Sequence, residues 1–416
     1  MASLVWGLAA LTLLLIILRP GGIPEAMWAT AGALLLIATR ALTVPVALGA
    51  VRAGFEVYAF LIGMMVLAEI ARERGVFDAL ASLALARARG SSARLFTLVF
   101  ASAVSVTALL SNDATAVVVT PSILFAMRAA GVAPLPSLFA CAFVANAASF
   151  VLPISNPANL LVFAGHMPSL GAWLLHLALP SAGALLATYL LLRYIFAREL
   201  AAPISAQALP PVQRGAREAG ILLGAGALVL IGVSAAGESL GWATLGVASV
   251  ILALIAARSP SVLASVARGI MWSIVPLVAA LFVIVVALER SGAFAILRHG
   301  LAYGESLPGP LAALGIGFAS GLVSNLLNNL PVALSVGSVV PGSHMPAAYA
   351  ALIGINVGPN LAVSGSLASI MWLAILRRHG LMLGAGQFFR LGLIVTPPAL
   401  GIALIFYYAL QAFGAP

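Results

Sequence analysis

Long apolar runs separated by short polar connections make up almost the whole chain. A window of about 20 residues, the length of a helix that crosses a bilayer core, places these runs at residues 4–18, 27–50, 55–71, 94–129, 135–165, 170–197, 219–257, 263–289, 308–340, 346–376 and 388–412. At roughly 30 residues for each span and its connection, the chain accommodates about ten to fourteen membrane-embedded segments. The pattern therefore predicts an all-α polytopic membrane protein.

Residues 1–18 are predicted to form the first membrane span and not a cleaved signal peptide. The segment has no basic stretch at its start, and it ends in Arg19-Pro20-Gly21-Gly22 where a cleavage site would need small residues.

Two polar connections are rich in arginine, Ala71–Arg94 and Arg193–Arg217. Short basic loops stay on the cytoplasmic side of a membrane, so we expect both connections there. The second lies near the middle of the chain. We therefore expect a cytoplasmic linker at 198–218, between an N-terminal transmembrane half (1–197) and a C-terminal transmembrane half (219–416).

Short polar motifs recur in the two halves in the same order. The paired motifs are Glu73–Phe77 with Glu289–Phe294, Ser111–Thr115 with Asn328–Pro331, Asn146 with Asn356, and Ser155–Asn159 with Ser364–Ser369. Weak internal symmetry of this kind marks secondary transporters. With an odd number of spans in each half, the two structural repeats would be inverted, and this is the arrangement that we expect.

The first polar interruption, Ser111–Thr115, places Asp113 within some thirty apolar residues. A carboxylate at the bilayer centre costs at least ~2.5 kcal/mol on insertion scales. One interpretation is a polar helix cap near the membrane surface. The other, which we favour, is the tip of a re-entrant hairpin that carries an ionisable site, because irregular backbone at membrane depth survives only inside protein or beside a cavity.

The second interruption runs from Asn146 to Asn159 and contains Pro153 and Pro157. Each proline removes an amide donor and leaves a carbonyl free. A helix that restarts at Ser155 or Asn156 would aim its free N–H groups into the break. The alternative is a kinked packing helix whose side-chain amides are satisfied.

The third and fourth interruptions mirror the first two. Residues 324–331 hold three asparagines, and residues 354–360 lead into a serine-rich segment. Gly354 and Gly358 alone could serve close helix packing. Two re-entrant hairpins and two broken spans together predict one polar site near the midplane, rich in amides and hydroxyls, which suits a neutral hydroxyl-bearing solute or an alkali cation. The expected substrate-binding residues are Asn112, Thr115, Asn146, Ser155, Asn156, Asn159, Asn328, Asn329, Asn356, Asn360, Ser364, Gly365 and Ser366.

Composition excludes several functions. Hydrophobic residues are 63% of the 416-residue chain and charged residues 7%, which a soluble globular protein does not show. All 20 basic residues are arginines, so there is no lysine for a nucleotide-binding P-loop. The net charge of +9 follows from loop arginines and not from a nucleic-acid site. A single cysteine, Cys141, and scattered histidines offer no metal site, nucleophile–base pair or cofactor chemistry.

At these residues the chain resembles the ArsB-type arsenite/antimonite permeases of the ion transporter superfamily. The matching strings are Asn112-Asp113, Ser155-Asn156-x-x-Asn159, Asn328-Asn329-x-Pro331, 354–359 and 365–372, in order over essentially the whole chain. The resemblance implies about ten spanning helices, two re-entrant hairpins and proton-coupled export of trivalent arsenic or antimony hydroxides. Some family members carry Asp where this chain has Asn146 and Asn356, and a basic residue where it has Asn360.

We therefore expect a multi-pass protein of the bacterial cytoplasmic (inner) membrane that exports arsenite or antimonite in exchange for protons. Asp113 is the expected proton carrier, and Glu69 and Glu73 are its rivals. The expected partners are the metalloid, protons and lipid, with a cytoplasmic ArsA-type ATPase left open, and no cofactor is expected. The alternatives are a sodium/proton antiporter, a carboxylate transporter and a structural membrane subunit; the last leaves the duplicated polar breaks without an explanation.

Overall fold

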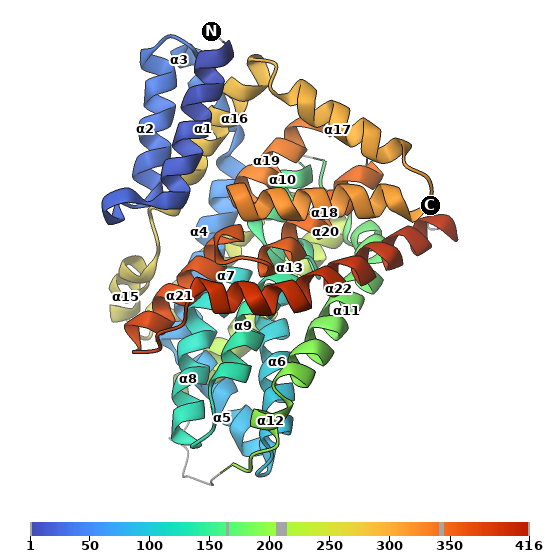
Figure 1. Cartoon of the computed structure of the whole chain (residues 1–416). Helices are drawn as coiled ribbons and strands as arrows, with labels where there is room; N and C mark the ends of the chain where they lie inside the picture. The colour runs from blue at the N-terminus through green and yellow to red at the C-terminus, as the bar shows by residue number, and fades with distance from the viewer. Residues whose placement is uncertain (1, 164–165, 205–213, 341–344, 415–416) are drawn as a thin grey trace.

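The computed structural model describes residues 2–163, 166–204, 214–340 and 345–414, and these ranges consist mainly of helices joined by short connections (Figure 1). Within them the β-type pairing is limited to an isolated antiparallel bridge between Ser91 and Pro203. In the first half the helices are α1 (Ala2–Leu18), α2 (Glu25–Ala38), α3 (Val44–Ala53), α4 (Phe55–Glu73), α5 (Val76–Ala88), α6 (Ser92–Leu109), α7 (Asn112–Ala114), α8 (Thr120–Ala129), α9 (Leu135–Ala147), α10 (Pro157–Phe163), α11 (Leu170–Ile195) and α12 (Ala197–Leu200).

The second half is equally helical. Its helices are α13 (Arg214–Ala236), α14 (Leu240–Ala256), α15 (Ser261–Gly269), α16 (Ile274–Arg290), α17 (Phe294–Ser306), α18 (Pro310–Leu327), α19 (Asn329–Val339), α20 (Met345–Val357), α21 (Leu367–Arg378) and α22 (Ala385–Ala412).

By length and composition, five of the described helices can cross a membrane: α6, α11, α13, α18 and α22. The number rises to seven if two bent pairs, α3 with α4 and α15 with α16, each count as one span. Shorter apolar helices, among them α1, α2, α9, α14 and α19, lie below the 18-residue length. The all-α polytopic fold predicted from the apolar runs is confirmed.

The order of elements in the first half is repeated in the second. A hairpin (α6 and α7–α8, then α18 and α19) is followed by a broken span (α9 and α10, then α20 and α21) and by a long helix (α11, then α22). Contacts between the halves are reciprocal: α10 packs on α19, and α21 packs on the π-helical turn η2 (Thr115–Val119) between α7 and α8. The long helices α11 and α22 cross one another (Figure 1). Two halves related by a twofold axis make reciprocal contacts of this kind. The two halves therefore pack against each other as one body.

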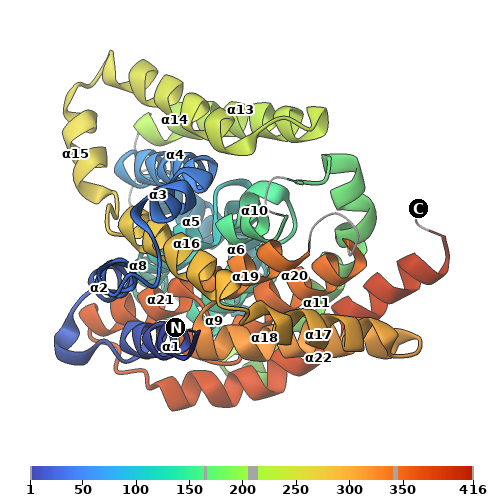
Figure 2. The ribbon, with the colours of Figure 1, turned by 90° about the horizontal axis from the view of Figure 1, so that it is seen from above.

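Several other helices pack beside α4, the first helix of the first repeat, and beside α16, the first helix of the second repeat. In Figure 2, α13 and α14 lie along one side of the molecule and α18 and α22 along the opposite side. Helix α14 packs along α4, while α2 and α3 pack on α16. The tips of the two hairpins and the two broken spans lie between these sides.

Close packing between α18 and α20 depends on glycine. A β-carbon at Gly354 would meet the backbone of Gly317, and one at Gly358 would meet the backbone of Gly321. Small residues four apart allow two helices to approach to backbone contact. The packing interpretation of these glycines is therefore correct, and it fixes the hairpin against the broken span of the same half.

The two arginine-rich connections meet in the structure. Ser92 Oγ donates to the Ala202 carbonyl at 2.5 Å, and the Ile204 amide donates to the Gly90 carbonyl at 3.0 Å. Their contact places them on the same side of the molecule, as the positive-inside pattern predicts. Of the expected linker 198–218, residues 205–213 lie outside the described residues, and the division into halves at this point stays a prediction.

Candidate functional site

The tip of the first hairpin is built by a serine cap. Helix α6 ends at Leu109, Ser111 is extended, and helical backbone then runs without a break through 112–129. Ser111 Oγ accepts from the Ala114 amide at 3.1 Å, which satisfies one of the free donors at a helix start. Asn112 and Asp113 are therefore the first residues of a helix whose N-terminus points into the protein.

The tip of the second hairpin also has a side-chain cap at a helix start, but the capping residue has a strained backbone. Asn328 separates α18 from α19, and its φ of 73° and ψ of 152° lie in a region that glycine normally occupies. Its Oδ1 accepts from the Leu330 amide at 3.3 Å. Strain of about 1–3 kcal/mol persists only where the surroundings hold it, and here it aims Asn329 and Leu330 toward the first hairpin.

The first broken span uses amides to satisfy its own freed backbone. Asn156 Oδ1 caps α10 by accepting from the Ala158 amide at 3.0 Å. Asn159 Nδ2 lies 2.9 Å from the Ser149 carbonyl and 3.2 Å from that of Pro153. Ser155 Oγ donates to the Ala108 carbonyl at 3.0 Å, which ties the break to the end of α6. The break is thus stabilised from within the protein.

The second broken span follows the same rules with Asn325 in the supporting role. Asn325 Nδ2 donates to the Gly358 carbonyl at 2.8 Å, and its Oδ1 accepts from the Ala362 amide at 2.9 Å. Ser364 Oγ donates to the carbonyl of Asn325 at 2.8 Å. Ser366 Oγ caps α21 through the Ala368 amide at 3.1 Å. Asn325 belongs to the polar string 324–331, but its role depends on a contact 33 residues away that the string does not reveal.

A buried network of amides joins the two broken spans. Asn146 Nδ2 donates to Ser369 Oγ and to Asn360 Oδ1, both at 3.0 Å. Asn356 Nδ2 donates to Asn159 Oδ1 at 3.2 Å, and Asn156 Nδ2 donates to Asn356 Oδ1 at 2.8 Å.

Two of these hydrogen bonds are repeats of each other. The donors Asn146 and Asn356 differ by 210 in number, and so do the acceptors Asn159 and Ser369, since 356 − 146 and 369 − 159 are both 210. In each bond the first arm of one broken span holds the second arm of the other. The repeat motifs found in the sequence therefore carry the cross-links between the halves.

The two hairpin tips and the two breaks meet at one small cavity. Two residues from each motif line it: Asn112, Asp113, Asn156, Pro157, Asn329, Leu330, Ser366 and Leu367. These are the caps or first residues of α7, α10, α19 and α21. The cavity measures about 10 Å³, enough for roughly one water molecule. All four polar interruptions of the sequence therefore contribute to one cavity.

The cavity combines amide, hydroxyl and carboxylate groups with converging helix N-termini. Backbone N–H groups and the helix dipoles favour oxygen atoms and negative charge there. Asp113 is the ionisable residue of this lining, and the corresponding residue of the second hairpin is Leu330. Asn112 Oδ1 is buried without a hydrogen-bond partner in the described part of the chain. A buried acceptor of this kind is available to a donor in the cavity, whether a water or a solute.

Asp113 also lines a second, larger pocket. This pocket, about 60 Å³, lies between α4, the start of α7 and the 269–271 connection, and it contains Glu69 and Pro157. Glu69 forms an ion pair with Arg72 at 2.6 Å. Half-buried Asp113 therefore stands between the central cavity and a pocket that holds another carboxylate.

The predicted site residues separate into three groups. Asn112, Asp113, Asn156, Asn329 and Ser366 line the cavity. Next to it, Asn328 and Ser364 line a pocket beside the second hairpin, and Ser155 and Gly365 support the breaks. The side chains of Asn146, Asn159, Asn356 and Asn360 are hydrogen-bonded within the network between the spans, and Thr115 pairs with Thr107 at 2.8 Å. Glu73 accepts from Ser265 at 2.6 Å on an exposed surface.

Duplicated hairpins and broken helices that meet at a buried polar cavity are the architecture of a secondary transporter. The chain belongs to the citrate transporter family (CitMHS), whose model matches residues 13–363. It is a multi-pass membrane protein of a transporter family.

Relatives and a solved structure narrow the comparison. The chain is 33% identical over 165 residues to the arsenical pump membrane protein of Escherichia coli K12, covering 38% of each protein, and 29% identical over 286 residues to that of Yersinia enterocolitica, covering 64% of this chain and 65% of the relative. The matched regions thus span less than two thirds of these relatives. The resemblance to arsenite permeases found in the motifs is confirmed.

The fold is also similar to the crystal structure of the YdaH transporter of Alcanivorax borkumensis, which is described as having an unusual topology. The TM-score is 0.62 at 17% identity, and the match covers 89% of this chain and 88% of that one. At this identity the similarity concerns the fold alone.

Proposed function

We propose that the protein is a secondary transporter that exports arsenite or antimonite in exchange for protons, with the central cavity as its substrate site. The observation that carries the proposal is the unpartnered Asn112 Oδ1 in a cavity lined by amides, a hydroxyl and one carboxylate. Arsenite in neutral water is an uncharged molecule with three hydroxyls, each of which both donates and accepts. Such a solute offers Asn112 a donor and accepts from the backbone N–H groups around it.

Asp113 is the proposed proton carrier. It faces both the central cavity and the pocket of Glu69, so that it connects the substrate site with a route for protons. Substrate arriving from one side and a proton arriving from the other would then compete for the same group or its neighbours. Because the cavity holds only about one water, substrate entry requires the hairpin tips and breaks to separate, as alternating access demands.

A carboxylate transporter is the second candidate, because four helix N-termini favour an anion and the family model carries that name. The lining argues against it. No Arg, Lys or His side chain is present among the eight lining residues to neutralise an anion, and carboxylate groups themselves only accept, so they give Asn112 Oδ1 no donor. A sodium/proton antiporter would use Asp113 and Asn112 Oδ1 as cation ligands. One transport assay distinguishes the arsenite, carboxylate and sodium alternatives.

Everted membrane vesicles provide the test. We expect vesicles that carry the protein to accumulate arsenite when a proton gradient is imposed, and citrate and sodium to leave that gradient unchanged. Sodium-dependent proton release, or citrate uptake, without arsenite uptake would contradict the proposal. The proposed location is the bacterial inner membrane, and adding a cytoplasmic ArsA-type ATPase to the vesicles would show whether such a partner increases export.

A further inference from the structure

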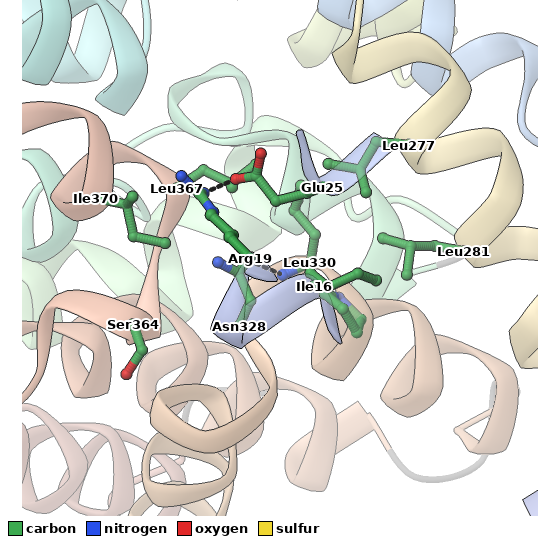
Figure 3. Close-up of a pocket in the computed structure, with 11 residues that line it drawn as sticks. Ile16, Arg19, Glu25, Leu277, Leu281, Asn328, Leu330, Ser364, Leu367 and Ile370 are labelled. Atoms are coloured by element: carbon green, nitrogen blue, oxygen red, sulfur yellow. Dashed lines mark hydrogen bonds and ion pairs between the residues drawn. The ribbon is translucent and has the colours of Figure 1, made fainter. Parts of the chain in front are cut away.

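A pocket separate from the central cavity lies at the side of the second hairpin. Its walls are the turn between α1 and α2, helix α16, the tip of the hairpin and the start of α21 (Figure 3). It measures about 40 Å³. Leu330 and Leu367 line both this pocket and the central cavity, so that these two side chains form the wall between them. This pocket therefore adjoins the central cavity proposed as the substrate site. We call it the outer pocket.

An ion pair between Arg19 and Glu25 occupies this outer pocket. The two side chains, 32% and 19% exposed, point toward one another in the middle of the pocket, with Ile370 and Ser364 on one side and Leu277 on the other (Figure 3). Charged groups in a mostly apolar pocket are costly unless they are paired, and here each is the partner of the other.

The backbone at Arg19 is held in an unfavourable conformation. Its φ of 45° and ψ of 53° are left-handed, which a non-glycine residue seldom adopts, and the following Pro20 disfavours helical conformations for the residue before it. The left-handed residue ends α1, as Arg40 and Arg89 do after other helices, and its amide donates to the Leu15 carbonyl at 2.9 Å; the turn leaves the guanidinium in the outer pocket.

The paired charges discriminate between solutes. Arg19 offers only donors and Glu25 only acceptors, so a neutral molecule with hydroxyl groups can accept from one and donate to the other. A carboxylate anion would be attracted by the guanidinium but repelled by the carboxylate beside it. Asn328 and Ser364 extend the polar lining toward the central cavity.

We propose that the outer pocket is a second solute site, in which Arg19 and Glu25 receive a small uncharged polyhydroxyl molecule and reject carboxylate anions before the central cavity is reached. The proposal rests on the proposed role of the central cavity as a substrate site. The proposal also explains how a member of the citrate transporter family could carry a neutral hydroxide, because Glu25 would repel carboxylate anions.

A labelling experiment tests the proposal without requiring arsenite transport. With Cys141→Ser as the background, Ile370→Cys places one thiol in the outer pocket, and its rate of reaction with a maleimide is measured in proteoliposomes. We expect citrate to leave this rate unchanged. When Glu25→Gln is added, Arg19 becomes available, and citrate should slow labelling in proportion to its occupancy of the pocket, by about tenfold when its concentration is about ten times its Kd.

Controls make each result decisive. Met382→Cys, an 88% exposed position outside the pocket, should react at the same rate with and without citrate. Adding Arg19→Gln to Glu25→Gln should remove the protection by citrate. If Glu25→Gln inserts poorly into the membrane, the exchanged pair Arg19→Glu with Glu25→Arg is used as a second variant, and it should show no protection by citrate, as the parent does. Protection by citrate with the intact pair, or no protection in Glu25→Gln, would overturn the proposal.

Transport measurements then separate this inference from the proposed function. We expect citrate to inhibit arsenite uptake in Glu25→Gln vesicles and not in wild-type vesicles. If the labelling results are as expected while wild-type vesicles carry no arsenite, the proposed substrate is wrong and the charge selection by the outer pocket stands.

Discussion

Asn112 and Asp113 are adjacent residues in different surroundings. Asn112 is buried with an acceptor that no described group satisfies, whereas Asp113 is half-buried between two cavities. In the second hairpin the corresponding residues are Asn329 and Leu330, so the carboxylate is present once. If Asp113 carries the proton as proposed, the duplicated framework has one proton-binding position in the central cavity.

Cys141 is expected to be dispensable for transport. It is fully buried in α9, among apolar side chains of the core, and is the only cysteine of the chain. Trivalent arsenic is held tightly by several converging thiolates, which one cysteine cannot supply, and a small buried residue is the common role of a free cysteine.

Cys141→Ser and Cys141→Ala should both retain most of the arsenite resistance of a sensitive host strain. The alanine variant controls for the buried hydroxyl of serine. Loss of resistance in both variants at normal membrane expression would show that the thiol takes part in transport.

At the scale of elements, the hairpin tip at α18–α19 is expected to bind substrate and not only to shape the fold. Asn329→Leu removes hydrogen-bonding groups from the cavity wall, and a substrate hydroxyl that they would bind is left without a partner, at a cost of about 1–3 kcal/mol. Arsenite uptake should fall at least tenfold with folded protein retained. Gln387→Leu, on an exposed part of α22, is the matched control, and equal damage from it would make the effect non-specific.

The α18–α20 contact is expected to set the stability of the second hairpin. Gly354→Ala places a methyl group against the Gly317 backbone, which cannot move aside as a flexible side chain would. Overpacking of this kind costs about 1–3 kcal/mol, and the thermal unfolding temperature in detergent should fall. Gly386→Ala, which has open space around it, should leave that temperature unchanged, and so an equal fall in both variants would refute the packing account.

Much of this element-level arrangement is predictable from the sequence. Polar strings inside apolar runs locate both hairpin tips and both breaks, because buried backbone without partners is too costly to occur by chance. The strings do not reveal which amides satisfy the backbone and which face the cavity. Asn159 and Asn156 look alike in sequence, yet Asn159 donates to carbonyls of its own break while Asn156 lines the cavity.

Other features depend on contacts between distant parts of the chain. Arg19 and Glu25 belong to a turn that reads as an ordinary span connection, and only the fold brings them beside the second hairpin. Several membrane helices are also shorter than a hydropathy window, because broken spans divide the hydrocarbon depth between two helices. The expected number of spans is therefore larger than the number of helices that meet the length criterion.

At the scale of the whole molecule, the two halves are joined by equivalent hydrogen bonds. Asn146 binds Ser369 and Asn356 binds Asn159, so the first arm of each broken span is hydrogen-bonded to the second arm of the other. A movement that opens the central cavity on one side therefore changes the contacts of both halves at once. This coupling is the property that alternating access requires.

Proton-driven arsenite uptake by Asp113→Asn vesicles tests the central claim most directly. The asparagine keeps nearly the same volume and fixes a neutral side chain, so the protein should insert and fold, and slow equilibration of arsenite should persist. The account predicts that accumulation against a gradient is abolished in Asp113→Asn and partly retained in Asp113→Glu, with Glu69→Gln as the comparison for the rival carboxylate. Accumulation by Asp113→Asn at the wild-type rate would contradict the account and would place the coupling group elsewhere.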